Sequence, residues 1–118
     1  MITRDSLLEY IAQKYHTIPE YLWTSAPEYA VLRHKKNRKW YAIIMNVTPD
    51  KVGLQGMDLI DILDIKGDPD MIATLISQKG FYPAYHMNKQ HWITIVLDGT
   101  VSDETIYQML DISYELTK

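Results

Sequence analysis

The sequence contains no cysteine and no long hydrophobic run, and each absence excludes a class of protein. Without thiols there are no disulfides, no thiolate metal ligands and no cysteine nucleophile. No apolar stretch approaches the roughly 20 residues that a membrane-spanning helix needs. The first residues start a polar helical pattern, in place of the basic and apolar regions of a signal peptide. We therefore expect a cytoplasmic protein with no membrane partner.

Basic residues are outnumbered in the chain as a whole, and they are unevenly placed. The 12 Lys and Arg residues stand against 15 Asp and Glu residues, which gives a net charge of −3. Residues 1–57 hold eight basic and five acidic residues, whereas residues 58–118 hold four and ten. Five of the basic residues fall within Arg33–Lys39. Binding to an anion would therefore be local, and the rest of the surface would oppose it.

The residues that are present have the composition of an ordinary globular chain, with 47% hydrophobic and 23% charged residues. Their periodicity predicts one domain over residues 1–118, of the α+β class, with helices against a mainly antiparallel five-stranded sheet in the order α-β-β-β-α-β-β-α. The expected elements are a helix at 4–16 capped by Thr3, strands at 28–34, 39–47 and 59–66, a helix from Asp68-Pro69 to Gly80, a hairpin of strands at 81–86 and 91–97, and a helix capped by Ser102.

Three details of this pattern make finer predictions. The strand at 39–47 is apolar on both faces, which is typical of a central strand. In the strand at 59–66 the apolar pattern slips at Leu63, which predicts a bulge. The Tyr-Leu-Trp segment at 21–23 is expected to fold against the core because of its large apolar area. Strict alternation along the strand at 39–47 gives two sets of side chains, Tyr41, Ile43 and Met45 on one face and Trp40, Ala42 and Ile44 on the other.

The turn between the first two strands has two interpretations. It is either a solvated, charged hairpin tip that protects the sheet against edge-to-edge association, or a basic wing that contacts phosphate and gains affinity through the release of counterions. The side chains available for phosphate contact are Arg33, Lys35, Lys36, Arg38 and Lys39.

The second candidate region is the predicted tip at 87–90 and its flanks. His86 and His91 would be cross-strand neighbours on paired strands, but a zinc site needs a further protein ligand, so a structural role is favoured and no metal or cofactor is expected. No serine has the base and orienting partner of a nucleophile, so no catalytic residue is predicted.

Asn88 and Lys89, with aromatic side chains behind them, suit contact with nucleic acid or with a peptide, and equally suit a rigid turn with a left-handed Asn.

The segment from Tyr85 to Trp92 also resembles the signature of the MmcQ/YjbR family of small bacterial proteins, and the resemblance extends from about Pro27 to the end of the chain. The signature side chains are Tyr85, His86, Met87, Asn88, Lys89, His91 and Trp92. The resemblance implies a two-layer α+β fold of the double-wing kind, described as DNA-binding, whose wings here would be Arg33–Lys39 and His86–His91. Lys66-Gly67 stands where relatives commonly place cysteine after lysine, which argues against a thiol-dependent role.

The sequence thus predicts a non-enzymatic domain that binds DNA weakly through two hairpin tips, with an adaptor for an unknown protein or peptide as the alternative, using an exposed aromatic surface. The residues expected to contact nucleic acid are Arg33, Lys35, Lys36, Arg38, Lys39, Asn88 and Lys89. DNA binding predicts a steep dependence on salt, whereas an aromatic interface is nearly insensitive to it.

Overall fold

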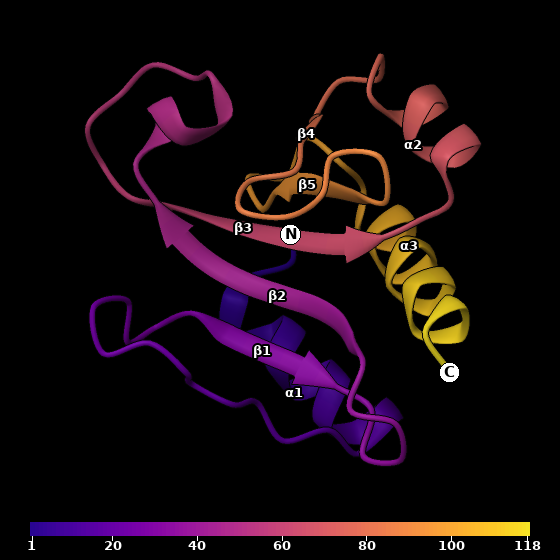
Figure 1. Ribbon diagram of the computed structural model, residues 1–118. Helices are drawn as coiled ribbons and strands as arrows, with labels where there is room; N and C mark the ends of the chain where they lie inside the picture. Colours follow the sequence, from indigo (N-terminus) through magenta and orange to yellow (C-terminus); the bar gives the residue numbers. More distant parts are fainter.

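The computed structural model describes residues 1–118 and consists of three α-helices, a short 3-10 helix and one five-stranded sheet (Figure 1). The predicted α+β class and element order are confirmed, with η1 added in the loop after the second strand. In chain order the elements are α1 (Arg4–Tyr15), β1 (Ala30–Arg33), β2 (Trp40–Val47), η1 (Pro49–Val52), β3 (Ile60–Lys66), α2 (Pro69–Leu75), β4 (Phe81–Pro83), β5 (Trp92–Val96) and α3 (Asp103–Leu116).

The sheet has the strand order β1-β2-β3-β5-β4, and every neighbouring pair is antiparallel. After β3 the chain passes through α2, enters the sheet at its edge as β4, and returns as β5 between β4 and β3. The predicted helix starts are also present: Thr3 accepts the amide of Ser6, Asp68 accepts the amide of Met71, and Ser102 caps α3. No helix is long and apolar enough to cross a membrane.

All three helices contribute to the larger core, which lies on one face of the sheet. Leu7 and Ile11 of α1 are fully buried there, as is Leu110 of α3, and Ile72 of α2 joins the same cluster. Figure 1 shows α1 behind β1 and β2, and α3 beside the end of β3. The opposite face has a smaller core that is covered by loops. That face therefore has room for side chains other than those of a helix.

A β-bulge between β1 and β2 decides which side chains of β2 reach the loop-covered face. The pairing shifts between Leu32 and Arg33, which leaves Tyr41 as the extra residue of β2. Tyr41 points into the larger core, and Trp40 packs against the smaller one, so the predicted alternation was wrong at these two positions. The bulge predicted at Leu63 was also wrong, because the pairing of β3 with both neighbours is continuous.

The segment at 21–23 lies on the surface, and the prediction that it folds against the core was wrong. The side chains of Tyr21, Leu22 and Trp23 are 51%, 46% and 37% exposed. The reason lies one residue earlier, where Glu20 forms a β-bridge with Val31 on the outer side of β1. The chain therefore follows the open edge of the sheet instead of crossing beneath it.

The hairpin of β4 and β5 is shorter than expected. Its pairing ends at Pro83 and Ile93, so residues 84–91 form a long connection instead of a four-residue tip. His86 and His91 both lie in this connection, outside the paired strands, and the predicted cross-strand pair of histidines was wrong. A proline in β4 has no amide to continue the ladder, which accounts for the early end of the pairing.

Candidate functional site

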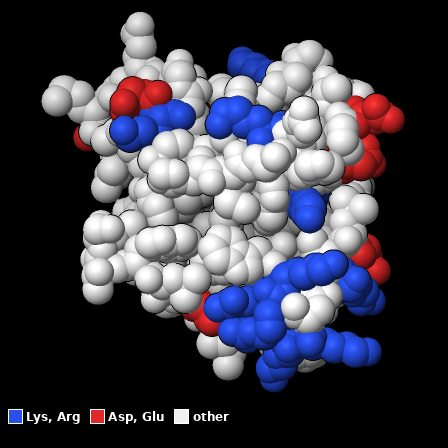
Figure 2. All heavy atoms as spheres, in the orientation of Figure 1, with Lys and Arg blue, Asp and Glu red and all other residues white.

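The connection between β1 and β2, residues 34–39, carries three exposed lysines, and we call it the basic turn. The side chains of Lys35, Lys36 and Lys39 are exposed, and none of them forms a salt bridge. Figure 2 shows basic side chains gathered over this turn as one continuous patch, beside a broad surface with little charge. The concentration of basic residues in the sequence is therefore also a concentration in space.

Hydrogen bonds hold the backbone of the basic turn in one shape. The amide of His34 donates to the carbonyl of Lys39 over 3.0 Å, and the amide of Arg38 donates to the carbonyl of His34 over 2.9 Å. The side-chain oxygen of Asn37 accepts the amide of Lys39 over 2.9 Å, and Arg38 has a left-handed φ of 65°. The lysines thus project from a defined backbone.

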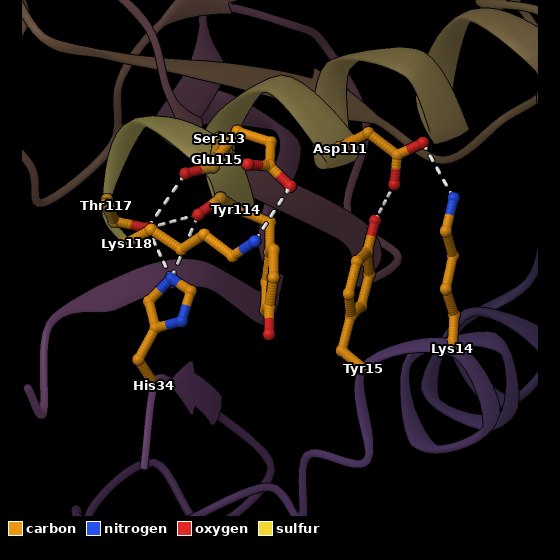
Figure 3. A network of polar contacts seen from close by, with 9 residues as sticks. All are labelled: Lys14, Tyr15, His34, Asp111, Ser113, Tyr114, Glu115, Thr117 and Lys118. Carbon is orange, nitrogen blue, oxygen red and sulfur yellow. Dashed lines mark hydrogen bonds and ion pairs between the residues drawn. The ribbon is translucent and has the colours of Figure 1, made fainter. Parts of the chain in front are cut away.

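The basic turn is fastened to the C-terminal end of α3 (Figure 3). Nδ2 of Asn37 donates to the carbonyl of Thr117 over 2.9 Å, and Nε2 of His34 lies 3.0 Å from the carbonyl oxygen of Tyr114. Because a carbonyl only accepts, Nε2 of His34 carries the proton. Burial lowers the pKa of His34, so the ring favours its neutral form. This buried contact restricts the movement of the turn.

The end of α1 joins the same network through Asp111 of α3. Figure 3 shows Tyr15 and Lys14 both reaching this carboxylate, with Lys14 Nζ 2.8 Å from Oδ2. The hydrogen bond with Asp111 raises the pKa of Lys14. The ring of Tyr15 stacks on Tyr114 with 4.3 Å between centroids. Two helices therefore support the strand end from which the basic turn projects.

A carboxylate engages two of the predicted phosphate ligands. Arg33 donates to both oxygens of Glu20, over 2.5 and 2.7 Å, and Arg38 Nη2 lies 3.4 Å from the same group. The hydrogen bond with Arg33 is the main cause that lowers the pKa of Glu20. The charge of Arg33 is largely neutralised by Glu20, and Arg38 interacts with the same carboxylate. The free positive charge of the turn lies on its lysines.

The second predicted tip uses its polar side chains within its own loop. Oδ1 of Asn88 accepts the amide of Gln90 over 2.8 Å, and Nζ of Lys89 donates to the carbonyl of Ala84 over 2.9 Å. The left-handed residue is His86, with a φ of 67°, and not the asparagine. The structure places this loop over the front of β3 and β5 in Figure 1, and no hydrogen bond or salt bridge joins it to the basic turn.

A buried carboxyl group supports this loop from below. Asp64 of β3 is fully buried, and its Oδ1 accepts the hydroxyl of Thr94 over 2.5 Å. The same hydroxyl oxygen accepts the amide of Tyr85 over 3.0 Å. Burial raises the pKa of Asp64 to about 7, although its hydrogen bond with Thr94 and the charge of Lys89 act in the opposite direction. The charge state of Asp64 is therefore linked to the backbone of the 84–91 loop.

An aromatic pocket of about 570 Å³ opens on the loop-covered face of the sheet. Its floor is Ile43 and Met45 of β2, and its walls come from residues 23–29, Trp40 and the loop at 86–87. The indole of Trp23 meets the ring of Trp40 edge-on, with 6.0 Å between centroids and an interplanar angle of 87°. The volume is within the range of small-molecule pockets, about 300–1,000 Å³.

Metal-ligating groups do not converge anywhere in the chain. No three His, Asp or Glu side chains lie close enough to hold one ion together. His86 lines the aromatic pocket, whereas His34 is committed to α3.

The sequence did not predict three structural features: the anchoring contact of His34, the buried Asp64 and the aromatic pocket. Asp64 gave a signal, because an acidic residue in an apolar central strand has to be buried. His34 and the pocket depend on segments distant in sequence, for example the 80 residues between His34 and Tyr114, and no local pattern could have shown them.

Comparison with known families gives one consistent result. The family model described as YjbR matches residues 12–116. The chain is 45% identical to the uncharacterised protein YyaQ of Bacillus subtilis (strain 168), over the full length of both. It is 37% identical to the uncharacterised protein YjbR of Escherichia coli (strain K12) over 54 residues, which cover 45% of this chain and 46% of that protein.

Solved structures show the same fold. The crystal structure of a Pseudomonas syringae protein superposes with a TM-score of 0.97 at 39% identity, and the alignment covers 99% of this chain and 100% of the Pseudomonas chain. The crystal structure of the Deinococcus radiodurans protein DR2400 superposes with a TM-score of 0.75 at 29% identity, and the alignment covers 98% of this chain and 78% of the Deinococcus chain.

Proposed function

This chain belongs to the YjbR family, and we propose that it is a non-enzymatic nucleic-acid-binding domain that contacts phosphates through the basic turn. The observation that carries the proposal is the set of three exposed lysines, Lys35, Lys36 and Lys39, on a backbone fastened to α3. Lysine is a phosphate ligand, and a fixed backbone lowers the ordering cost of binding.

The two tips play different parts in this binding. The basic turn supplies the phosphate contacts, because its lysines have no acidic partner. Lys89 of the 84–91 loop is a secondary contact, since its ammonium group already donates to a backbone carbonyl. The acidic half of the chain, residues 58–118, repels the phosphate backbone and limits the affinity. Binding is therefore expected to be weak and sensitive to salt.

Fluorescence anisotropy of labelled single-stranded and duplex DNA, titrated with the full chain at low and near-physiological salt, tests this proposal. The variant Lys35→Ala/Lys36→Ala is expected to weaken binding about tenfold at low salt, because two phosphate contacts are lost. Both side chains are exposed and make no hydrogen bond, so the fold should be unaffected.

A matched control removes two positive charges elsewhere. Lys51→Ala/Lys79→Ala changes two exposed lysines in η1 and after α2, outside the basic turn, and gives the same net charge. Equal loss in both variants would mean that only net charge matters. Absence of binding by the unmodified protein at low salt would refute the proposal.

A second candidate function is an adaptor for a protein or peptide, and the exposure of the 21–23 segment favours it. Tyr21 and Leu22 are about half exposed, next to Ile18 at 80%. An interface of this kind gains from apolar burial, so its affinity should change little with salt. The same anisotropy series separates the two candidates.

A further inference from the structure

The aromatic pocket has features of a site for a flat ring. Seven of its nine lining residues are hydrophobic. Trp23 and Trp40 meet edge-on, so the two indoles border one hollow without filling it. Trp23 is 37% exposed although its ring is large, so it retains surface on which a ligand can stack. The two lining residues that are not hydrophobic are Ser25 and His86, and the side chain of neither makes a hydrogen bond within the protein.

The pocket and the basic turn are parts of the same hairpin. Trp40, which lines the pocket, follows Lys39 directly in the chain, so their Cα atoms are about 3.8 Å apart. Trp40 also pairs with Arg33 across the two strands, where the bulge at Tyr41 turns the indole toward the loop-covered face. Positive charge and a stacking surface therefore lie side by side, as Figure 2 shows for the basic patch and the uncharged surface next to it.

An unpaired nucleotide matches this combination better than other ligands do. Its phosphate carries the charge that Lys39 and its neighbours complement, and its base has the flat face on which aromatic side chains stack. A base within a duplex is stacked and paired, so it cannot enter a pocket without being extruded. A peptide with an aromatic side chain would fill the pocket, but its occupancy would leave the lysines of the turn unused.

We infer that the aromatic pocket takes an unpaired nucleobase while the basic turn holds the adjoining phosphates, so that the nucleic acid recognised by this domain is single-stranded. This inference rests on the proposed function and specifies its ligand. Recognition proceeds by stacking on the exposed surface of Trp23, with Trp40 bordering the same hollow and with His86 and Ser25 as its polar side chains.

The test compares two aromatic substitutions in the same exposed segment. Trp23→Ala removes a wall of the pocket, and Tyr21→Ala removes an aromatic ring of comparable exposure that does not line it. Anisotropy with a labelled oligothymidylate is expected to show about tenfold weaker binding for Trp23→Ala, in line with the loss of one stacked base. Tyr21→Ala should bind as the unmodified protein does, and the unmodified protein should favour the single strand over duplex.

A second measurement does not depend on a variant that folds. Thymidine 5′-monophosphate, added to the ¹⁵N-labelled protein, is expected to shift the indole N–H resonances of Trp23 and Trp40 but not that of Trp92, which is buried outside the pocket. N-acetyl-tryptophanamide serves as the probe for a peptide ligand. Shifts of Trp23 and Trp40 with this probe and not with the nucleotide would overturn the inference in favour of the adaptor.

The outcomes distinguish the inference from the function on which it rests. Unchanged oligothymidylate binding by Trp23→Ala, with binding lost in Lys35→Ala/Lys36→Ala, would overturn the pocket and leave phosphate binding in place. Tighter binding of the unmodified protein to duplex DNA than to the single strand would likewise overturn the pocket and leave phosphate binding in place. Absence of binding to both nucleic acids would overturn the proposed function and the inference together.

Discussion

At the scale of single residues, Asp64 is the least expected group in the chain. It lies in the middle of a central strand, fully buried, with one oxygen bonded to Thr94 and the other without a partner. Burial of an ionised carboxylate is costly, which is why the pKa of Asp64 rises to about 7. Because Asp64 bonds to Thr94, which in turn accepts the amide of Tyr85, the protonation of Asp64 affects the hydrogen bonds that support the 84–91 loop.

The raised pKa predicts a pH dependence of stability with a definite sign. Between the pKa of about 3.8 in the unfolded chain and about 7 in the folded protein, only the folded state holds the proton. The free energy of unfolding therefore falls as pH rises through this window. The gap of about three pH units corresponds to about 4 kcal/mol at most. Asp64→Asn keeps an acceptor for Thr94 and should remove this contribution to the pH dependence. Compared with the unmodified protein at the same pH, the variant should therefore be more stable at pH 8 than it is at pH 4.

Urea denaturation of both proteins across this pH range measures the effect. Asp61→Asn is the matched control, because Asp61 lies on the same strand and is only half buried. A difference in unfolding free energy between Asp64→Asn and the unmodified protein that stays constant with pH would contradict the prediction.

At the scale of elements, Gly80 sets the geometry with which the chain enters β4. Its φ is +94°, and a Cβ placed there would lie 2.5 Å from Cγ2 of Val101. The turn after α2 and the segment that precedes α3 thus pass each other at a point where only hydrogen fits.

Gly80→Ala is expected to destabilise the fold by about 2 kcal/mol or more, since the backbone penalty and the contact with Val101 add together. Gly53→Ala is the control, because Gly53 has a φ of +77° but no atom near its Cβ position. It should cost only the backbone penalty, about 1–2 kcal/mol. Thermal denaturation compares the two. Equal losses would mean that the close approach at Gly80 has no energetic effect.

The sequence predicted the helices and strands, but it did not predict the details that depend on contacts between them. Caps and periodicity predicted all three helices and all five strands, because Thr3, Asp68 and Ser102 act on local hydrogen bonds. The bulge at Tyr41 was missed, because register depends on the partner strand and not on the alternation of one strand. The surface position of the 21–23 segment was missed for a related reason, since it follows from the bridge at Glu20.

At the scale of the whole molecule, the helices and the aromatic pocket lie on opposite faces of the sheet, and the basic turn projects from the end of β1 and β2. The aromatic pocket lies on the loop-covered side, whereas the larger core lies on the helix side, where His34 and Asn37 fasten the basic turn to α3 (Figure 1). Substitutions of the pocket residues and of the exposed lysines can therefore alter binding without disturbing the larger core. The sequence predicted the residues of the basic turn, but not that Arg33 is neutralised by Glu20, because the two are 13 residues apart.

The count of free lysines predicts how binding varies with salt. Three phosphate contacts by Lys35, Lys36 and Lys39 should give a slope of about −2 for log K against log salt concentration on single strands, at about −0.7 for each contact. Lys35→Ala/Lys36→Ala should reduce the slope to about −0.7. Anisotropy titrations over a series of salt concentrations measure both slopes. A slope near zero, or one that the substitutions leave unchanged, would exclude these lysines as phosphate contacts.

The attachment of the basic turn to α3 also has a consequence for the order of events during protein synthesis. The hydrogen bond from Asn37 to Thr117 joins residues 80 positions apart. A ribosome that makes about 5–20 residues per second completes the turn several seconds before its anchor exists. Until then only the hydrogen bonds within residues 34–39 hold the turn. A nascent chain therefore exposes the positive charge of the turn early, and the turn acquires its attachment to α3 only after that helix has docked.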